Sequence, residues 1–78
     1  MSLIKKPTTL IDSTTDENYI YIGTVMNVGS TSPSTSDEIW EITRITMQDS
    51  KATKIENGIN ADNKKYLAWD QRTTYNYI

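Results

Sequence analysis

Two arginines are the polar side chains of this sequence that most suggest a specific binding role. Arg44 lies in an alternating pattern on the same side as Trp40, and Arg72 follows Asp70 by two residues. A guanidinium group presents a rigid fork of donors, so either arginine could clamp a carboxylate or a phosphate. The structural alternative is an arginine that pairs with an aspartate or stacks on Trp40 or Trp69, joining the last strand to the middle one. Because a single arginine specifies no ligand, the sequence favours the structural role.

The sequence contains few of the side-chain types that catalysis usually needs. The sequence contains no histidine and no cysteine, which removes Ser-His and Cys-His pairs and the two best zinc ligands. Ten Asp and Glu residues remain, but no apolar segment places two carboxylates at a spacing that suggests an acid-base pair. We therefore expect a protein that is not an enzyme, with no catalytic residue and no cofactor.

Oxygen ligands of the kind that calcium prefers gather in the segment 57–63. They are Asn57, Asn60, Asp62 and Asn63, beside Gly58. The spacing does not match the D-x-[DN]-x-[DN]-G order of an EF-hand loop, and only one carboxylate is present. A plain turn is the better interpretation, and we expect no metal site.

Two tryptophans and five tyrosines could form a platform on which sugars or bases stack. Phenylalanine is absent, so the same rings must also supply most of a bulky core. Burial in the core or in a subunit interface is therefore favoured. The candidate core or interface residues are Tyr19, Tyr21, Trp40, Arg44, Trp69, Arg72, Tyr75 and Tyr77.

Charge and hydropathy exclude two classes of partner. The formal net charge is −2, and the eight basic residues are scattered along the chain, whereas a nucleic-acid interface would gather them on one face. No apolar run approaches the roughly 18 residues of a membrane span, and the N-terminus lacks the apolar region of a signal peptide. We expect a soluble protein, made in a cytoplasm, that binds neither nucleic acid nor membrane.

Two segments show the alternation of β-branched and aromatic residues that is typical of strands. In 18–26, Tyr19 and Tyr21 share one face with Gly23, and isoleucines lie on the other; a glycine inside a strand marks a bulge or a close approach of another backbone. In 38–48, both faces again carry bulky side chains. The first strand is therefore expected to be central, or to be covered on its second face by a neighbouring subunit.

Turn chemistry and alternation assign most of the remaining segments. Asn57-Gly58 is the strongest two-residue turn signal, because a type I′ turn needs positive φ at both positions. Loops or turns are expected at 27–37, 49–51 and 59–65, short strands at 52–56 and 72–78, and either a loop or a helical turn at 66–69.

The predicted fold is all-β: a small antiparallel β-sandwich or barrel of about four to six strands, with an extended N-terminal arm. The arm covers residues 1–17, where only Leu3, Ile4, Leu10 and Ile11 are large and apolar, and a single β-domain covers 18–78. A chain of 78 residues buries only about 60% of its unfolded surface. Without disulfides or metals, self-association is the remaining source of stability. We expect a homo-oligomer, with three copies as the first guess.

Three strand patterns together suggest a family. The motifs are Y-I-Y-I-G at 19–23, W-x-I-x-R-I at 40–45, and W-D-x-R at 69–72 followed by a terminal tyrosine. Over 18–78 the chain resembles short structural proteins of tailed bacteriophages. It departs from that pattern in having no aromatic residue just before Asn57-Gly58.

The resemblance implies a virion component at the tail, neck or capsid surface that binds itself and neighbouring virion proteins. Two other classes stay open. A glycan-binding module at a host surface would need an exposed Trp40 or Trp69. A phage-encoded regulator of a host protein would be monomeric and missing from purified virions.

Overall fold

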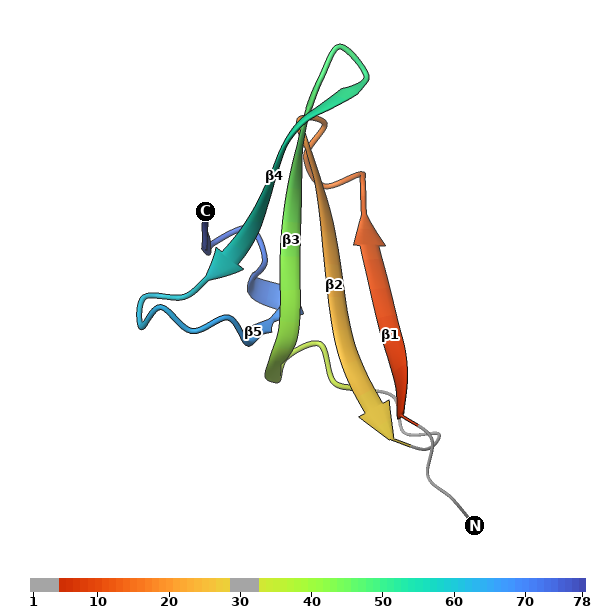
Figure 1. The fold of residues 1–78 in the computed structure, drawn as a ribbon, viewed down its shortest axis with the longest axis vertical. Coiled ribbons are helices and arrows are strands. Elements are labelled where there is room, and N and C mark those ends of the chain that lie inside the picture. Colours follow the sequence, from red (N-terminus) through yellow and green to blue (C-terminus); the bar gives the residue numbers. More distant parts are fainter. Residues whose placement is uncertain (1–4, 29–32) are drawn as a thin grey trace.

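The computed structural model describes residues 5–28 and 33–78, and the described chain is all-β (Figure 1). The elements in chain order are β1 (Lys5–Asp12), β2 (Tyr19–Val28), β3 (Glu38–Gln48), β4 (Lys51–Ile59), β5 (Leu67–Ala68), the 3-10 turn η1 (Trp69–Gln71) and β6 (Asn76–Tyr77). All strand pairs are antiparallel. The prediction of an all-β, antiparallel fold of about four to six strands is confirmed, whereas its choice between a sandwich and a barrel is not decided by a single sheet of this kind.

The strands form one sheet in the order β1-β2-β3-β4-β6, and β5 pairs with the first residues of β3. Figure 1 shows β1 to β4 side by side, with the C-terminal segment returning to the lower part of the sheet. Side chains of that segment pack on one face of the sheet. We call this the inner face, and the opposite side the outer face.

The two long strands expected from alternation are present. β3 has the expected bounds, and its inward side chains Trp40 and Ile42 are buried, while Ile39 is exposed. The close approach expected at Gly23 is also present, although a side chain makes it instead of a backbone. A Cβ added at Gly23 would overlap the indole ring of Trp69, so only glycine fits beneath that ring.

The β3–β4 hairpin turns at Asp49 and Ser50, where φ is 53° and 65°. Both residues therefore have the left-handed conformation that two-residue type I′ turns need. The turn expected at Asn57-Gly58 is wrong, since both residues lie inside β4 and pair with the C-terminal residues. Gly58 serves packing, because a Cβ there would lie 2.9 Å from atoms of both Leu67 and Tyr77.

The expected boundary between an arm at 1–17 and a domain at 18–78 does not coincide with a structural boundary. Residues 5–12 of the expected arm form β1, which pairs residue by residue with β2. The physical reason that β1 belongs to the domain is a contact with a distant part of the sequence, because Asp12 at the end of β1 is buried against Arg72. Residues 1–4 lie outside the described part of the chain.

The C-terminal segment is less regular than the alternation suggested. Of the strand expected at 72–78, only Asn76 and Tyr77 form β6. The segment 66–69, expected as a loop or helical turn, contains β5 and the start of η1. The hydroxyl of Tyr75 accepts the backbone N–H of Ala68 at 3.0 Å, which holds the short irregular segment together.

Candidate functional site

The aromatic side chains form the core on the inner face. Tyr21, Trp40, Trp69 and Tyr77 are buried, with Trp40 only 1% exposed. The two indole rings lie 6.1 Å apart, and Tyr21 and Tyr77 lie 5.8 Å apart. A glycan platform built on the tryptophans therefore lacks the exposed rings that it needs.

Two further tyrosines, Tyr19 and Tyr75, lie partly buried at the margin of the core. Tyr19 is 6.2 Å from the ring of Tyr21. All eight residues predicted from the sequence, namely these two tyrosines, the four buried rings and the two arginines, therefore lie in the inner-face cluster or against it.

Arg72 joins the C-terminal segment to the first strand. Its Nη2 lies 2.9 Å from Asp12 Oδ2, its Nε donates to the same oxygen at 3.0 Å, and its Nη1 donates to the Trp69 carbonyl at 3.1 Å. The guanidinium carbon also lies 4.6 Å from the Trp69 ring centroid. The partner is Asp12, 60 positions away, and the donors of Arg72 are largely used within the molecule.

Asp12 is the buried carboxylate of the described chain. Its Oδ1 accepts the backbone N–H groups of Thr14 and Thr15, each at 3.0 Å. Hydrogen bonding from Thr15, from the Thr14 N–H and from Arg72 holds the pKa of Asp12 well below its usual value, because all of these donors favour the charged form. An acid held this strongly ionised does not donate protons near neutral pH.

Arg44 has a structural environment of the same kind. Its Nη2 donates to Glu56 Oε1 at 3.0 Å across the β3–β4 pair. The guanidinium lies 4.4 Å from the ring centroid of Tyr19 and 4.6 Å from that of Tyr77. Both arginines thus pair with carboxylates and stack on rings, which is the structural role that the sequence favoured. The partners differ in part from the expected ones, because Arg44 pairs with Glu56 and stacks on tyrosines instead of Trp40, and Arg72 joins the C-terminal segment to the first strand instead of the middle one.

Of the polar segment expected as a plain turn, residues 57–59 belong to β4 and residues 60–64 close on themselves. Asn60 Oδ1 accepts the N–H groups of Asp62 and Lys64, and Asn63 has a φ of 60°. Among residues 5–28 and 33–78, no group of three or more acidic residues could hold a metal ion. The same residues include no helix long and apolar enough to cross a membrane.

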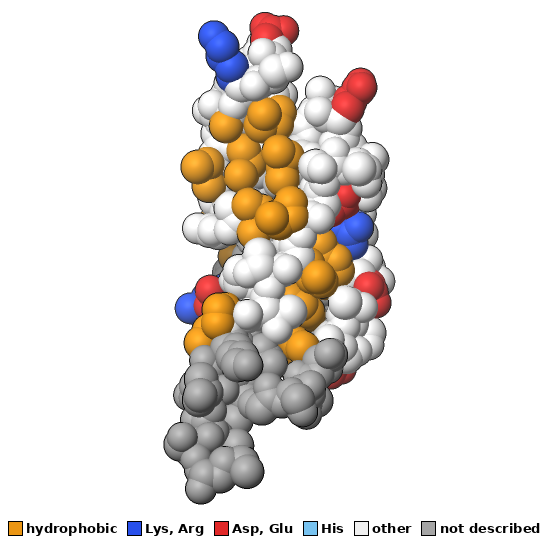
Figure 2. Space-filling model, turned by 90° about the vertical axis from the view of Figure 1, so that its right-hand side faces the viewer, with side chains coloured by type: hydrophobic (Ala, Val, Ile, Leu, Met, Phe, Trp, Pro, Cys, Tyr) orange, Lys and Arg blue, Asp and Glu red, His pale blue; other side chains and the backbone are white. Residues whose placement is uncertain are grey.

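On the outer face, isoleucines of neighbouring strands lie side by side, and they take no part in the inner-face core. Register places Ile11 beside Ile22, and Ile20 beside Ile45 and then Ile55. Ile55 is 70% exposed and Ile11 is 67% exposed. Figure 2 shows hydrophobic side chains gathered over the upper half of the molecule, with charged groups toward its edges. We call Ile11, Ile20, Ile22, Ile45, Met47 and Ile55 the isoleucine face.

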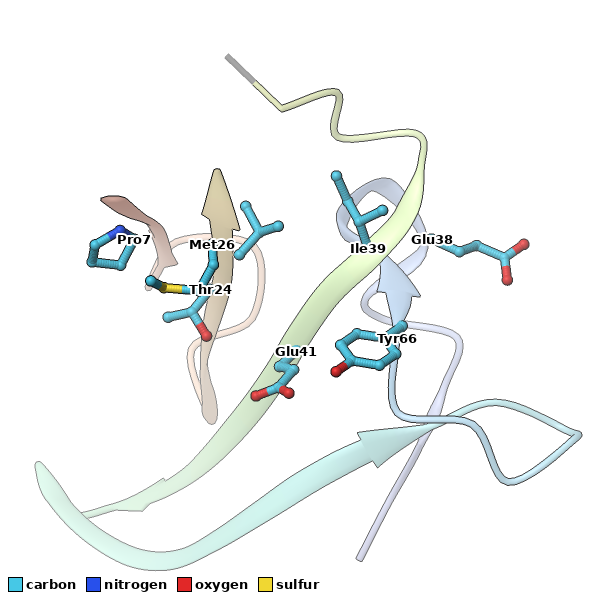
Figure 3. Close-up of a pocket in the computed structure, with 8 residues that line it drawn as sticks. Pro7, Thr24, Met26, Glu38, Ile39, Glu41 and Tyr66 are labelled. Carbon is cyan, nitrogen blue, oxygen red and sulfur yellow. The ribbon is translucent and has the colours of Figure 1, made fainter. Parts of the chain in front are cut away.

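A groove of about 730 Å³ lies at the other end of the outer face, between β2 and β3 (Figure 3). β1 and β2 supply one wall and β3 with Tyr66 supplies the other. The residues that line it are Pro7, Thr24, Val25, Met26, Glu38, Ile39, Glu41 and Tyr66. Apolar walls beside two carboxylates suit a ligand that is itself apolar and positively charged.

Reasoning from sequence missed the groove and its residues. Alternation does reveal that isoleucines share one side of β2 and β3, which is the signal for the isoleucine face. The groove arises where two strands separate, and no local pattern reports that. Comparison with known proteins returned no matching protein family, no curated relative and no similar solved structure.

Proposed function

We propose that this chain is a non-catalytic structural protein that assembles with copies of itself and with neighbouring proteins, as a component of a bacteriophage particle. The observation that supports assembly is the isoleucine face, where Ile11 and Ile55 are about 70% exposed on a sheet with a single thin core. Exposed apolar patches of this kind mark interaction sites. The phage setting is supported by the sequence resemblance alone.

The chemistry of the isoleucine face favours a second copy as its partner. The outward side chains in the rows of Ile20 and Ile22 are isoleucine, threonine and asparagine, and the nearest charge on this face of β3 is Glu41, one row further along opposite Thr24. Such a surface matches another that is apolar and uncharged, and copies of the chain arranged about a symmetry axis supply one to each other. Fully burying one isoleucine stabilises by about 1.5–3 kcal/mol, so a few such side chains offset the cost of association at its lower end.

Sedimentation at micromolar concentration tests the assembly. We expect an oligomer for the natural chain, with three copies as the first guess, and a shift toward monomer for Ile55→Glu and Ile11→Glu. Thr73→Glu is the matched control, because it adds the same charge at an exposed position away from the sheet. A natural chain that stays monomeric, with a melting temperature independent of concentration, would contradict the proposal.

Mass spectrometry of purified particles tests the setting. A structural component appears there at a fixed copy number. A regulator of a host protein is monomeric and absent from the particles, so this result decides between the two classes.

A further inference from the structure

Asn57-Gly58 is a chemically reactive pair, although β4 makes no turn there. The side-chain amide of an asparagine can be attacked by the backbone nitrogen of the next residue, and a following glycine leaves that nitrogen unshielded because it has no Cβ. Of the six asparagines in the sequence, Asn57 alone precedes a glycine. Its side chain is exposed in the folded chain. Asn57 is therefore the asparagine of this chain that is most open to the reaction.

The reaction is a deamidation through a cyclic imide. The Gly58 nitrogen forms a bond to Cγ of Asn57 while the bond from Cγ to Nδ2 breaks, and the amide leaves as ammonia with the proton of the Gly58 N–H. Water then opens the five-membered ring. Attack of water at Cγ gives an aspartate at position 57. Attack at the main-chain carbonyl carbon gives an isoaspartyl linkage, in which the backbone runs through Cβ and Cγ.

Pairing with the C-terminal residue holds Asn57 away from the geometry of the ring. Ring closure requires Cβ of Asn57 and the Gly58 nitrogen to be eclipsed, whereas strand backbone has a ψ of about +135°, which turns that nitrogen away from Cβ. Rotating the peptide plane would also swing the Asn57 carbonyl oxygen, which accepts the Ile78 N–H at 2.9 Å. The Asn57 N–H donates to the Ile78 carbonyl at 2.8 Å, so the two residues are bonded in both directions.

Packing restrains Gly58 in the same way. Gly58 is buried, and a Cβ there would lie 2.9 Å from atoms of both Leu67 and Tyr77, so its peptide cannot rotate while these side chains stay in place. Figure 1 shows the C-terminus beside the end of β4, where β6 contributes only two residues. Short elements of this kind open locally at a lower free energy than the whole fold. We propose that Asn57 is a deamidation site that the docking of β6 and Ile78 protects, and that it reacts when this segment detaches from β4.

The isoaspartyl product makes the detachment permanent. It adds one atom to the backbone of β4 immediately before Gly58, where the close fit to Leu67 and Tyr77 leaves no room for a shifted chain. The two bonds to Ile78 and the pairing of Gly58 with Tyr77 cannot then both form again. Tyr77 loses its place beside Tyr21 in the core. This chemistry does not depend on the proposed self-assembly.

Mass spectrometry of the full chain, incubated at mildly alkaline pH with and without urea, tests the site. The tryptic peptide 55–64 also contains Asn60 and Asn63, which serve as internal controls, and deamidation shows as the mass shift from amide to acid. We expect Asn57 to react faster than both controls in the unfolded chain, and at least about tenfold more slowly in the folded chain. Equal rates for the three asparagines in urea overturn the site, and equal rates for Asn57 in the folded and unfolded chains overturn its protection.

Ile78→Pro, compared with Ile78→Ala, tests the role of the C-terminal pairing. Both variants remove a side chain that is 72% exposed, but only proline removes the N–H that bonds to Asn57. With both variants folded by tryptophan fluorescence, we expect Asn57 to react several-fold faster in the proline variant. Equal rates overturn the proposed protection by Ile78.

The natural chain in urea below its unfolding transition supplies the same test without a substitution. Deamidation of Asn57 should rise before Trp40 becomes exposed, because β6 detaches first. A rate that rises only together with the exposure of Trp40 overturns the local detachment.

Carboxypeptidase digestion of the purified isoaspartyl form tests the lasting effect. Asn57→Asp is the matched control, because it carries the charge of the product without the added backbone atom. We expect Ile78 and Tyr77 to be removed several-fold faster from the isoaspartyl form than from the control or the natural chain. Equal digestion of the isoaspartyl form and Asn57→Asp overturns the role of the added atom.

Discussion

The two faces of the sheet are built from different side chains and meet different surroundings. On the inner face, the C-terminal segment covers Tyr21, Trp40 and Ile42 so closely that none is more than 4% exposed. On the outer face, at the same strands, isoleucines one residue away in sequence remain half-buried or exposed. The large rings are thus used to close one face, and the β-branched side chains are left for contact with another molecule.

The exposed area of the chain agrees with this division. The chain exposes 5604 Å², whereas a compact monomer of 8.9 kDa exposes about 4,800 Å². An outer face that no other described segment covers contributes to this exposed area. The comparison therefore predicts large effects of substitutions on the inner face and small effects on the outer face of the isolated chain.

Trp40→Ala should have the largest effect on stability. Trp40 is 1% exposed and contacts Trp69, and truncating a buried tryptophan costs about 3–5 kcal/mol, much of the stability of a small domain. We expect the variant to be unfolded by circular dichroism and chemical denaturation. Tyr66→Ala is the control, because it removes an exposed ring. A folded Trp40→Ala chain with an unchanged melting temperature would place that ring outside the core.

Asp12→Asn should have the next largest effect, and it should change the pH dependence. Replacing the charge weakens hydrogen bonds from Thr14, Thr15 and Arg72, at a cost of about 1.5–3 kcal/mol. The folded-state pKa of Asp12 lies below the value of about 3.9 in the unfolded chain. The unfolded state therefore binds more protons between those values, and stability is lost as pH falls below about 5.

Urea denaturation from pH 7 to pH 2 measures this dependence. The natural chain should lose stability steadily toward low pH, and the Asp12→Asn chain should lose less over the same range. Parallel curves for the two chains would mean that Asp12 has an ordinary pKa in the folded state.

Gly58→Ala should have a smaller effect on the same face. The added Cβ would lie 2.9 Å from Leu67 and from the rigid ring of Tyr77. Overpacking costs about 1–3 kcal/mol, and we expect the lower end because the Leu67 methyl can shift. Thermal melts of the variant should show a lower midpoint. A higher midpoint would mean that removing the flexibility of a turn-like Asn57-Gly58 outweighs the steric overlap.

Ile55→Thr should have the smallest effect, at the outer face. Ile55 is 70% exposed, and surface substitutions usually change stability by less than about 0.5 kcal/mol. Below the association threshold the melt should be unchanged, and at higher concentration the oligomer should weaken. A large loss in the dilute chain would show that the isoleucine face stabilises the single subunit, and the contrast between the faces would fail.

The sequence predicted the parts of the fold that local chemistry determines. Alternation found β3 with its correct bounds and the separation of Trp40 from the isoleucines. It failed where packing overrides propensity: Asn57-Gly58 has the composition of a turn, but β4 continues through it because Gly58 makes room for Tyr77. The Asp12–Arg72 pair and the groove depend on how distant segments meet, which local patterns do not report.

The sequence separation between Asp12 and Arg72 also affects the order in which the parts of the chain fold. The β3–β4 hairpin closes across the two residues Asp49 and Ser50, and hairpins form in about 1–10 μs. Joining residues 60 positions apart carries a larger entropic cost of loop closure, and such non-local contacts slow folding. We expect the backbone amides of β3 to be protected from hydrogen exchange before Trp40 is buried. Both faces of the sheet are then exposed to water during that interval. Stopped-flow tryptophan fluorescence beside pulsed hydrogen exchange measures the order, and a single shared phase would contradict it.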